Sequence, residues 1–176
     1  PLAVSGQGMR GVMLEQKKGA FDWVVLGGRT IASQAGAAAT NGRYARSLYS
    51  AKLGATPFSG VKLNANYFVS TDEVGSLSSD PASPNFRGPT LVPQKNSGYG
   101  LDLSWEPVSR LKFVAAYQKN SYWVNLGAPP VNDNAIRAEF SFERKIFKIR
   151  SFVQRAGANF VAFGNPAIVG DRMTYN

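Results

Sequence analysis

The side chains of this chain that could do chemistry are carboxylates, amines and hydroxyls, because its 176 residues include no histidine and no cysteine. Without those two residue types the chain has no Ser-His-Asp or Cys-His nucleophile, no zinc site of the usual ligand types and no disulfide framework. Carboxylates are left as the main candidates for acid–base work, and there are 11 of them.

Closely spaced carboxylates occur at Asp72 and Glu73 and at Glu139 and Glu143. Catalysis by a carboxylate pair requires a fixed separation within a cleft and a raised pKa for one partner. Most of the carboxylates in this chain have basic residues nearby, which favours solvated ion pairs. We therefore expect no enzymatic activity, no cofactor and no bound metal.

The elements that position these side chains are predicted to be β-strands, since apolar and polar residues alternate over most of the chain. Four hairpins are expected, with strands at 9–15 and 20–28, 43–55 and 61–71, 97–105 and 111–120, and 134–142 and 147–155. Tight turns are expected at 16–19, 56–60, 106–110 and 143–146, and longer connections at 30–42, 73–96 and 123–133. Residues 159–163 either extend the last strand or begin a ninth, and 172–176 resemble the start of a strand, so we expect about 8–10 strands.

The second and third hairpins repeat each other with a shift of 50 positions. Tyr49 corresponds to Tyr99, Pro57 to Pro107 and Tyr67 to Tyr117. The repeating unit is one hairpin, which is typical of an up-and-down barrel rather than of a propeller blade with its four strands. The turns predict that Leu53 lies opposite Leu63 and that Glu139 forms a cross-strand ion pair with Arg150.

Alternation alone does not separate a soluble sheet from a membrane barrel. Three features favour the membrane barrel: strands of about 9–13 residues, short turns alternating with long connections, and aromatic residues near the strand ends of the apolar face. We expect aromatic residues at the membrane interfaces, namely Tyr49, Tyr67, Tyr99, Trp105, Tyr117, Phe142 and Phe147. We expect the polar face to line a pore, through Arg46, Lys52, Lys62, Asn64, Asn66, Asp102, Lys112, Arg137, Glu139, Lys148 and Arg150.

The formal net charge of +9 is compatible with anionic partners, although the basic residues are dispersed and no nucleic-acid-binding motif is present. Two alternatives stay open. One is a soluble β-barrel that binds an apolar ligand with Leu53, Leu63, Leu103 and Phe113 facing inward. The other is a basic module that binds cell-wall polyanions. The proline-containing connection 73–96 could act as a lid or plug, contact a neighbouring subunit, or form a surface loop.

The segments LYSAKLGATPFSGVKLNANYFVS and LDLSWEPVSRLKFVAAYQK, with their short x-P-Φ-S-x turns, resemble outer-membrane porin sequence over roughly residues 40–155. The sequence pattern is similar to that of the large barrels of S-layer-type outer-membrane proteins of the Deinococcus–Thermus kind. The resemblance implies an outer-membrane or cell-envelope protein that combines a scaffolding role with passive passage of ions and small solutes. Its partners would be membrane lipid and either the rest of a larger barrel or further copies. Because the chain begins at Pro1 without an initiator Met, we expect residues 1–176 to be one segment of such a barrel.

Overall fold

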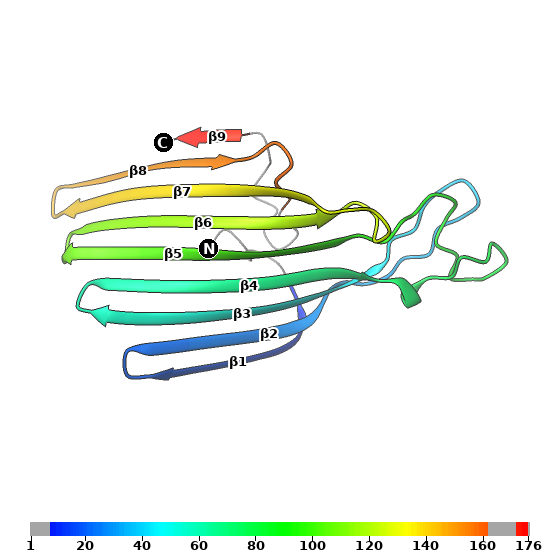
Figure 1. Ribbon diagram of the computed structural model, residues 1–176, viewed down its shortest axis with the longest axis horizontal. Coiled ribbons are helices and arrows are strands. Elements are labelled where there is room, and N and C mark those ends of the chain that lie inside the picture. Colours follow the sequence, from blue (N-terminus) through cyan, green and yellow to red (C-terminus); the bar gives the residue numbers. More distant parts are fainter. Residues whose placement is uncertain (1–7, 162–171, 176) are drawn as a thin grey trace.

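The computed structural model describes residues 8–161 and 172–175, and these residues form one antiparallel sheet of nine strands in sequential order. Figure 1 shows the strands side by side, joined by tight turns at one end and longer connections at the other. The strands are β1 (Arg10–Lys18), β2 (Phe21–Ile31), β3 (Ala45–Phe58), β4 (Val61–Glu73), β5 (Lys95–Val108), β6 (Leu111–Trp123), β7 (Val131–Arg144), β8 (Phe147–Ala156) and β9 (Arg172–Tyr175).

The predicted all-β, up-and-down architecture is confirmed, but the nine strands do not close into a barrel. Within the described ranges, β1 and β9 are the two edges of the sheet, and each pairs with one neighbour. The ninth strand lies at Arg172–Tyr175, whereas 159–161 are not in a strand and 162–163 lie outside the described residues. No helix in the described part of the chain has the length and apolar character needed to span a bilayer.

The four tight turns are shorter than predicted, and this changes the register of each predicted strand pair. Each turn has two residues, at 19–20, 59–60, 109–110 and 145–146. Leu53 therefore pairs with Ala65 rather than Leu63, and Glu139 lies directly opposite Phe152 rather than Arg150. The predicted pairing was wrong by two residues. Because side chains alternate with a period of two, a two-residue shift leaves every residue on its predicted face.

Glycine and proline explain the geometry at the turn end of the sheet. Gly19 and Gly60 occupy their turns with positive φ values of 60° and 80°, a region that residues with a Cβ rarely adopt. In β3 and β5 the register shifts just before the turn, beside Pro57 and Pro107. A β-bulge is a position where a strand tolerates proline, because the ladder is already interrupted there. The shared bulge shows that the 50-residue sequence repeat is also a structural repeat.

The connections 32–44 and 74–94 pack against each other beyond the strand ends, on the right of Figure 1. The backbone nitrogens of Gly36 and Gly42 donate to the carbonyls of Phe86 and Arg87, at 2.7 and 2.9 Å. The side chain of Asn41 holds Thr90 through two hydrogen bonds, at 2.7 and 3.0 Å. The connection that contains the prolines, which includes a 3₁₀ turn at Val74–Ser76, is therefore an ordered loop beyond the sheet.

Candidate functional site

The two faces of the sheet differ in both chemistry and exposure. Large apolar side chains on one face are open to the surroundings: Leu53 is 64% exposed, Leu101 61% and Tyr49 58%. Polar side chains on the opposite face are shielded, and Gln118 and Asn120 are 1% and 2% exposed. A water-soluble sheet normally shields its apolar face and exposes its polar face, so this sheet has the reverse arrangement.

We call the exposed apolar surface of β2 to β8 the apolar window. In β2, β4, β6 and β8 it comprises the four consecutive outward positions nearest the turn. In β3, β5 and β7 it comprises the next four, because Phe58, Val108 and Arg144 lie between it and the turn. All of these window positions are apolar except Gly27 and Ser151. The window positions nearest the turn are Phe21, Ala55, Val61, Trp105, Leu111, Phe142 and Phe147. The positions farthest from it are Gly27, Tyr49, Tyr67, Tyr99, Tyr117, Ile136 and Val153. The predicted interfacial aromatic residues all belong to these two sets.

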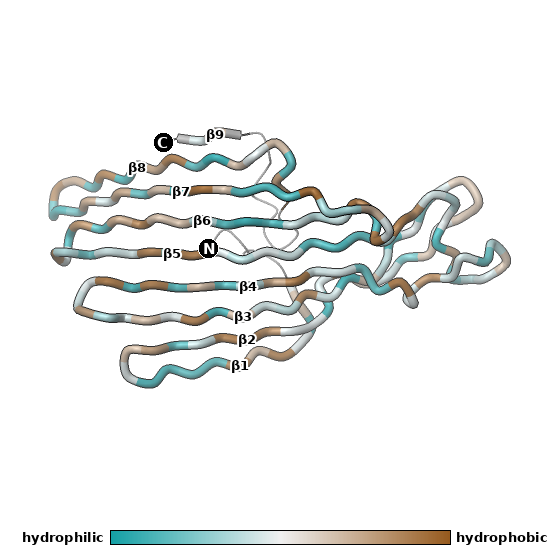
Figure 2. The backbone as a smooth tube through the Cα atoms, in the orientation of Figure 1, coloured by the Kyte–Doolittle hydropathy of each residue, from teal (hydrophilic) through white to brown (hydrophobic). Residues whose placement is uncertain are grey.

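The next outward position on the loop side of the window is polar in six of the seven strands. These positions are Arg29, Ser47, Val69, Ser97, Lys119, Asn134 and Arg155. The apolar window therefore ends at nearly the same step from the turn in each strand. Figure 2 shows the change toward hydrophilic residues on the loop side in β5 and β6.

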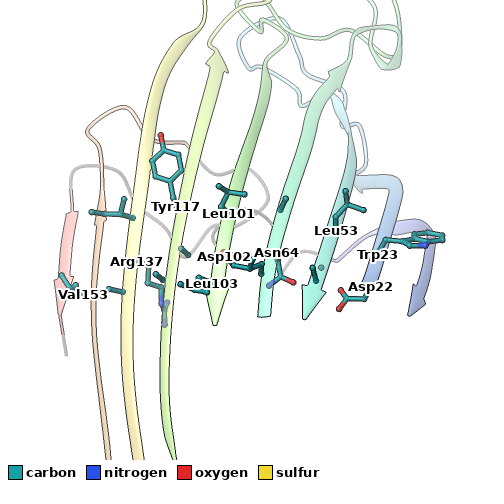
Figure 3. A pocket seen from close by; sticks show the side chains of 18 of the residues that line it. Asp22, Trp23, Leu53, Asn64, Leu101, Asp102, Leu103, Tyr117, Arg137 and Val153 are labelled. Atoms are coloured by element: carbon teal, nitrogen blue, oxygen red, sulfur yellow. The ribbon is translucent and has the colours of Figure 1, made fainter. Parts of the chain in front are cut away.

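A hollow of about 1190 Å³ crosses the apolar face (Figure 3). Its lining is mostly apolar and includes Trp23, Leu53, Leu101, Leu103 and Tyr117 of the apolar window, with alanines at 55, 65, 115 and 138. Asp22, Asn64, Asp102 and Arg137, which have the opposite parity in their strands, also contribute to it.

The residues predicted to line a pore all lie on the opposite face, which we call the polar face. Cross-strand pairing places Lys52 opposite Asn66 and Asn64 opposite Asp102. In the next row of the polar face toward the turn, Val114 of β6 lies between Ser104 of β5 and Glu139 of β7. Arg46, Lys62, Lys112, Arg137, Lys148 and Arg150 occupy positions of the same parity in their strands.

Ion pairs connect many of these residues. Glu139 accepts hydrogen bonds from Arg137 at 2.7 Å and from Arg150 at 2.9 Å. The predicted Glu139–Arg150 pair is confirmed, although the two residues are diagonal neighbours in the observed register rather than directly opposite. Arg46 pairs with Asp72 at 2.7 Å, and both side chains are largely shielded.

The pair between Lys62 and Asp22 spans three strands and was not predicted. The Nζ atom of Lys62 on β4 lies 2.7 Å from Oδ2 of Asp22 on β2. Gly54 on β3 lies between them, and a Cβ there would come within 2.2 Å of Oδ1 of Asp22. The missing side chain of Gly54 therefore makes room for the carboxylate. The sequence signal was present, because Asp22 has the opposite parity to Phe21 and Trp23.

Amide side chains occupy the loop half of the polar face, where the chain leaving β8 folds across it. Phe160 is 3% exposed and packs with Ala135 and Ala156. The carbonyl of Val161 accepts hydrogen bonds from the side-chain amides of Asn120, at 2.6 Å, and of Asn96. Residues 157–161 therefore cover part of the polar face. Sequence reasoning missed this contact because its partners are more than 40 residues away along the chain.

Beyond the apolar window, toward the loops, Glu73 forms a small polar cluster with Arg29 and Ser47. Hydrogen bonds from the Arg29 guanidinium and the Ser47 hydroxyl hold the pKa of this carboxyl below its usual value. In the residues that the structure describes, no group of three or more Asp or Glu side chains is placed to hold a metal ion.

Comparisons with protein-family models, with curated proteins and with solved structures found no match for this chain. We therefore infer the function of the chain from the two faces of the sheet.

Proposed function

We propose that this chain forms part of the wall of a transmembrane β-barrel, with the apolar window facing lipid and the polar face lining a water-filled passage. The observation that carries the proposal is the reversed exposure of the two faces. Apolar side chains around half exposed, such as Leu63 at 46% and Tyr67 at 53%, recur on strand after strand. Such a large exposed apolar surface needs a partner, and lipid hydrocarbon fits it.

The polar face suits contact with water. Charged side chains on this face are partly open to solvent: Lys62 is 44% exposed and Arg150 is 56% exposed. The interleaved ion pairs would then be part of the lining that ions and small solutes meet.

The role that fits these features is a porin-like protein of the outer membrane or cell envelope, permitting passive passage of ions and small solutes. The S-layer-type scaffolding role belongs to the same proposal and rests on the sequence resemblance. Closure of the wall would be supplied by further strands, either from a longer chain or from further copies, because β1 and β9 have unpaired edges within the described ranges.

Membrane extraction followed by planar-bilayer recording tests this proposal. We expect the protein to require detergent for extraction and to produce stepwise ionic conductance after insertion. A protein that stays monodisperse in plain buffer would contradict the membrane location, and inserted protein without conductance would contradict the passage.

One observation favours a second candidate function, the binding of an apolar ligand by a soluble sheet. The hollow on the apolar face is large enough for a small apolar molecule. This candidate predicts a water-soluble protein whose hollow takes up a fluorescent fatty acid, with reduced uptake after a Leu101→Asp change. The basic, polyanion-binding alternative is less favoured, because Lys62, Arg137 and Arg150 are already paired with carboxylates.

A further inference from the structure

The turns of the sheet are staggered in a regular way that carries information about the membrane. One hydrogen-bonded row crosses seven strands, through Phe21, Ala55, Leu63, Leu103, Ala115, Ala138 and Val153. In the second strand of each hairpin, the paired residue nearest the turn lies further from this row than in the hairpin before. These residues are Phe21, Val61, Leu111 and Phe147.

Subtraction of residue numbers gives the size of the stagger. Phe21 is itself in the row, Leu63 to Val61 is two residues, Ala115 to Leu111 is four and Val153 to Phe147 is six. Each hairpin thus advances by two residues, or one residue per strand. Figure 1 shows the same progression, with each turn further out than the one before it.

The apolar window follows the turns and not the hydrogen-bonded rows. In β2 the row residue, Phe21, is the outward position nearest the turn, whereas in β8 the row residue, Val153, is the farthest of the four. The window therefore crosses the sheet obliquely. An advance of about 3.3 Å along each strand for every 4.8 Å across gives an angle of about 35°.

We propose that the bilayer plane runs parallel to the line of turns, so that the strands tilt by about 35° from the membrane normal and the hydrocarbon contacts the whole apolar window. This inference rests on the proposed membrane function and adds the orientation of the wall. Transmembrane barrels have strand tilts of about 35–45°, a range reached here from the stagger alone.

The oblique plane brings the aromatic residues to two levels. Tyr49 and Tyr117 lie two rows apart in the ladder, yet they fall within about one residue of the same height once the stagger is applied. Trp105 and Phe142, which lie one row apart, likewise reach the same height at the opposite boundary. Within one strand, the first and last positions of the apolar window are six residues apart. This separation corresponds to about 16 Å of membrane depth between Cα atoms. Their side chains extend this toward the about 25 Å apolar band of such barrels.

Depth-dependent fluorescence quenching tests the proposal, using single cysteines in this cysteine-free chain. A fluorophore is attached to Ala55→Cys, Ala115→Cys or Val153→Cys, three positions in one hydrogen-bonded row. Bilayers then contain lipid brominated either near the headgroup or near the acyl-chain end. With about 2.7 Å of depth per residue, we expect Ala115 about 1 Å from the bilayer centre and the other two about 7 Å from it.

A second set provides the matched control: Ala65→Cys, Ala115→Cys and Ser151→Cys are the third outward positions from the turn in β4, β6 and β8. They lie in three different rows, and we expect equal depths. If the first set shows equal depths and the second unequal ones, the oblique plane is wrong while membrane insertion stands. If no position in either set is quenched, the proposed membrane function itself fails. The first set depends on Ala115→Cys, because the other two positions are expected at equal distances from the bilayer centre. Leu103→Cys, the neighbour of Ala115 in the same row, replaces it if that variant is lost.

Discussion

Adjacent residues in the same strand have opposite environments, and β4 shows this at Lys62, Leu63 and Asn64. Leu63 is 46% exposed on the apolar face, whereas Lys62 is paired to Asp22 on the polar face. The same substitution should therefore have very different costs at neighbouring positions. Such a contrast is what the proposed position of the sheet between lipid and water predicts.

For Leu63→Arg we expect a loss of about 2–4 kcal/mol in the free energy of unfolding, because the substitution places a charge in hydrocarbon near the middle of the bilayer. The control is Asn64→Arg, which places the same charge on the polar face opposite Asp102 and should cost much less. Guanidinium unfolding in lipid vesicles, followed by tryptophan fluorescence, measures both. Equal losses would contradict the assignment of the faces.

Glu139 is the carboxylate with the most ion-pair partners on the described polar face, and it is expected to influence ion selectivity. Glu139→Gln removes the negative charge between Arg137 and Arg150, so the reversal potential in a salt gradient should shift toward anions. Glu143→Gln is the control: its pair with Lys148 is exposed on both sides, at 66% and 62%, and screening by water should make its shift smaller. A shift toward cations, or a larger shift for Glu143→Gln, would contradict this role.

At the scale of elements, the hairpin turns set the stagger of the sheet, and two glycines allow their effects to be separated. Gly60 combines a φ of 80° with a close approach, since a Cβ there would lie 2.3 Å from the carbonyl oxygen of Glu106. Gly19 has a φ of 60°, but nothing lies within 4 Å of its Cβ position.

We expect Gly19→Ala to cost about 1–2 kcal/mol, for the left-handed backbone alone. Gly60→Ala should cost more, because it also disturbs the hydrogen bond from the Glu106 nitrogen to the Gly60 carbonyl, at 2.6 Å. Unfolding free energies of the two variants measure the difference. A Gly60→Ala variant no less stable than Gly19→Ala would show that the contact between neighbouring hairpins does not hold the stagger.

The strands and faces could be predicted from the sequence, but the register could not. Alternation identified which side of β3 carries Tyr49 and which carries Lys52, because that pattern is local. The pairing of Leu53 depends on whether the turn has two or five residues, and the bulge beside Pro57 decides this. The contact of Phe160 with the polar face depends on tertiary packing, which has no period in the sequence.

At the scale of the whole molecule, the described strands form an open sheet in which β1 and β9 each pair with one neighbour, and the more exposed face of the sheet is the apolar one. Its apolar window, its staggered turns and its paired charges are mutually consistent in a membrane wall. The stagger was the feature hardest to predict from the sequence, because it appears only after four separate registers are combined. Alternation predicted a barrel; the structure confirms an up-and-down sheet, and the combined registers add the proposed direction of the membrane normal.

The central claim is that the apolar face contacts lipid and the polar face contacts water, and two adjacent residues of β6 test it most directly. Ala115 lies in the apolar window and Val114 on the polar face, between Ser104 and Glu139. Nitroxide labels on Ala115→Cys and Val114→Cys in bilayers report collisions with oxygen, which concentrates in hydrocarbon, and with a water-soluble nickel chelate. We predict high oxygen access at 115 and high nickel access at 114. The opposite pattern, or a label at 115 that meets neither reagent, would contradict the account.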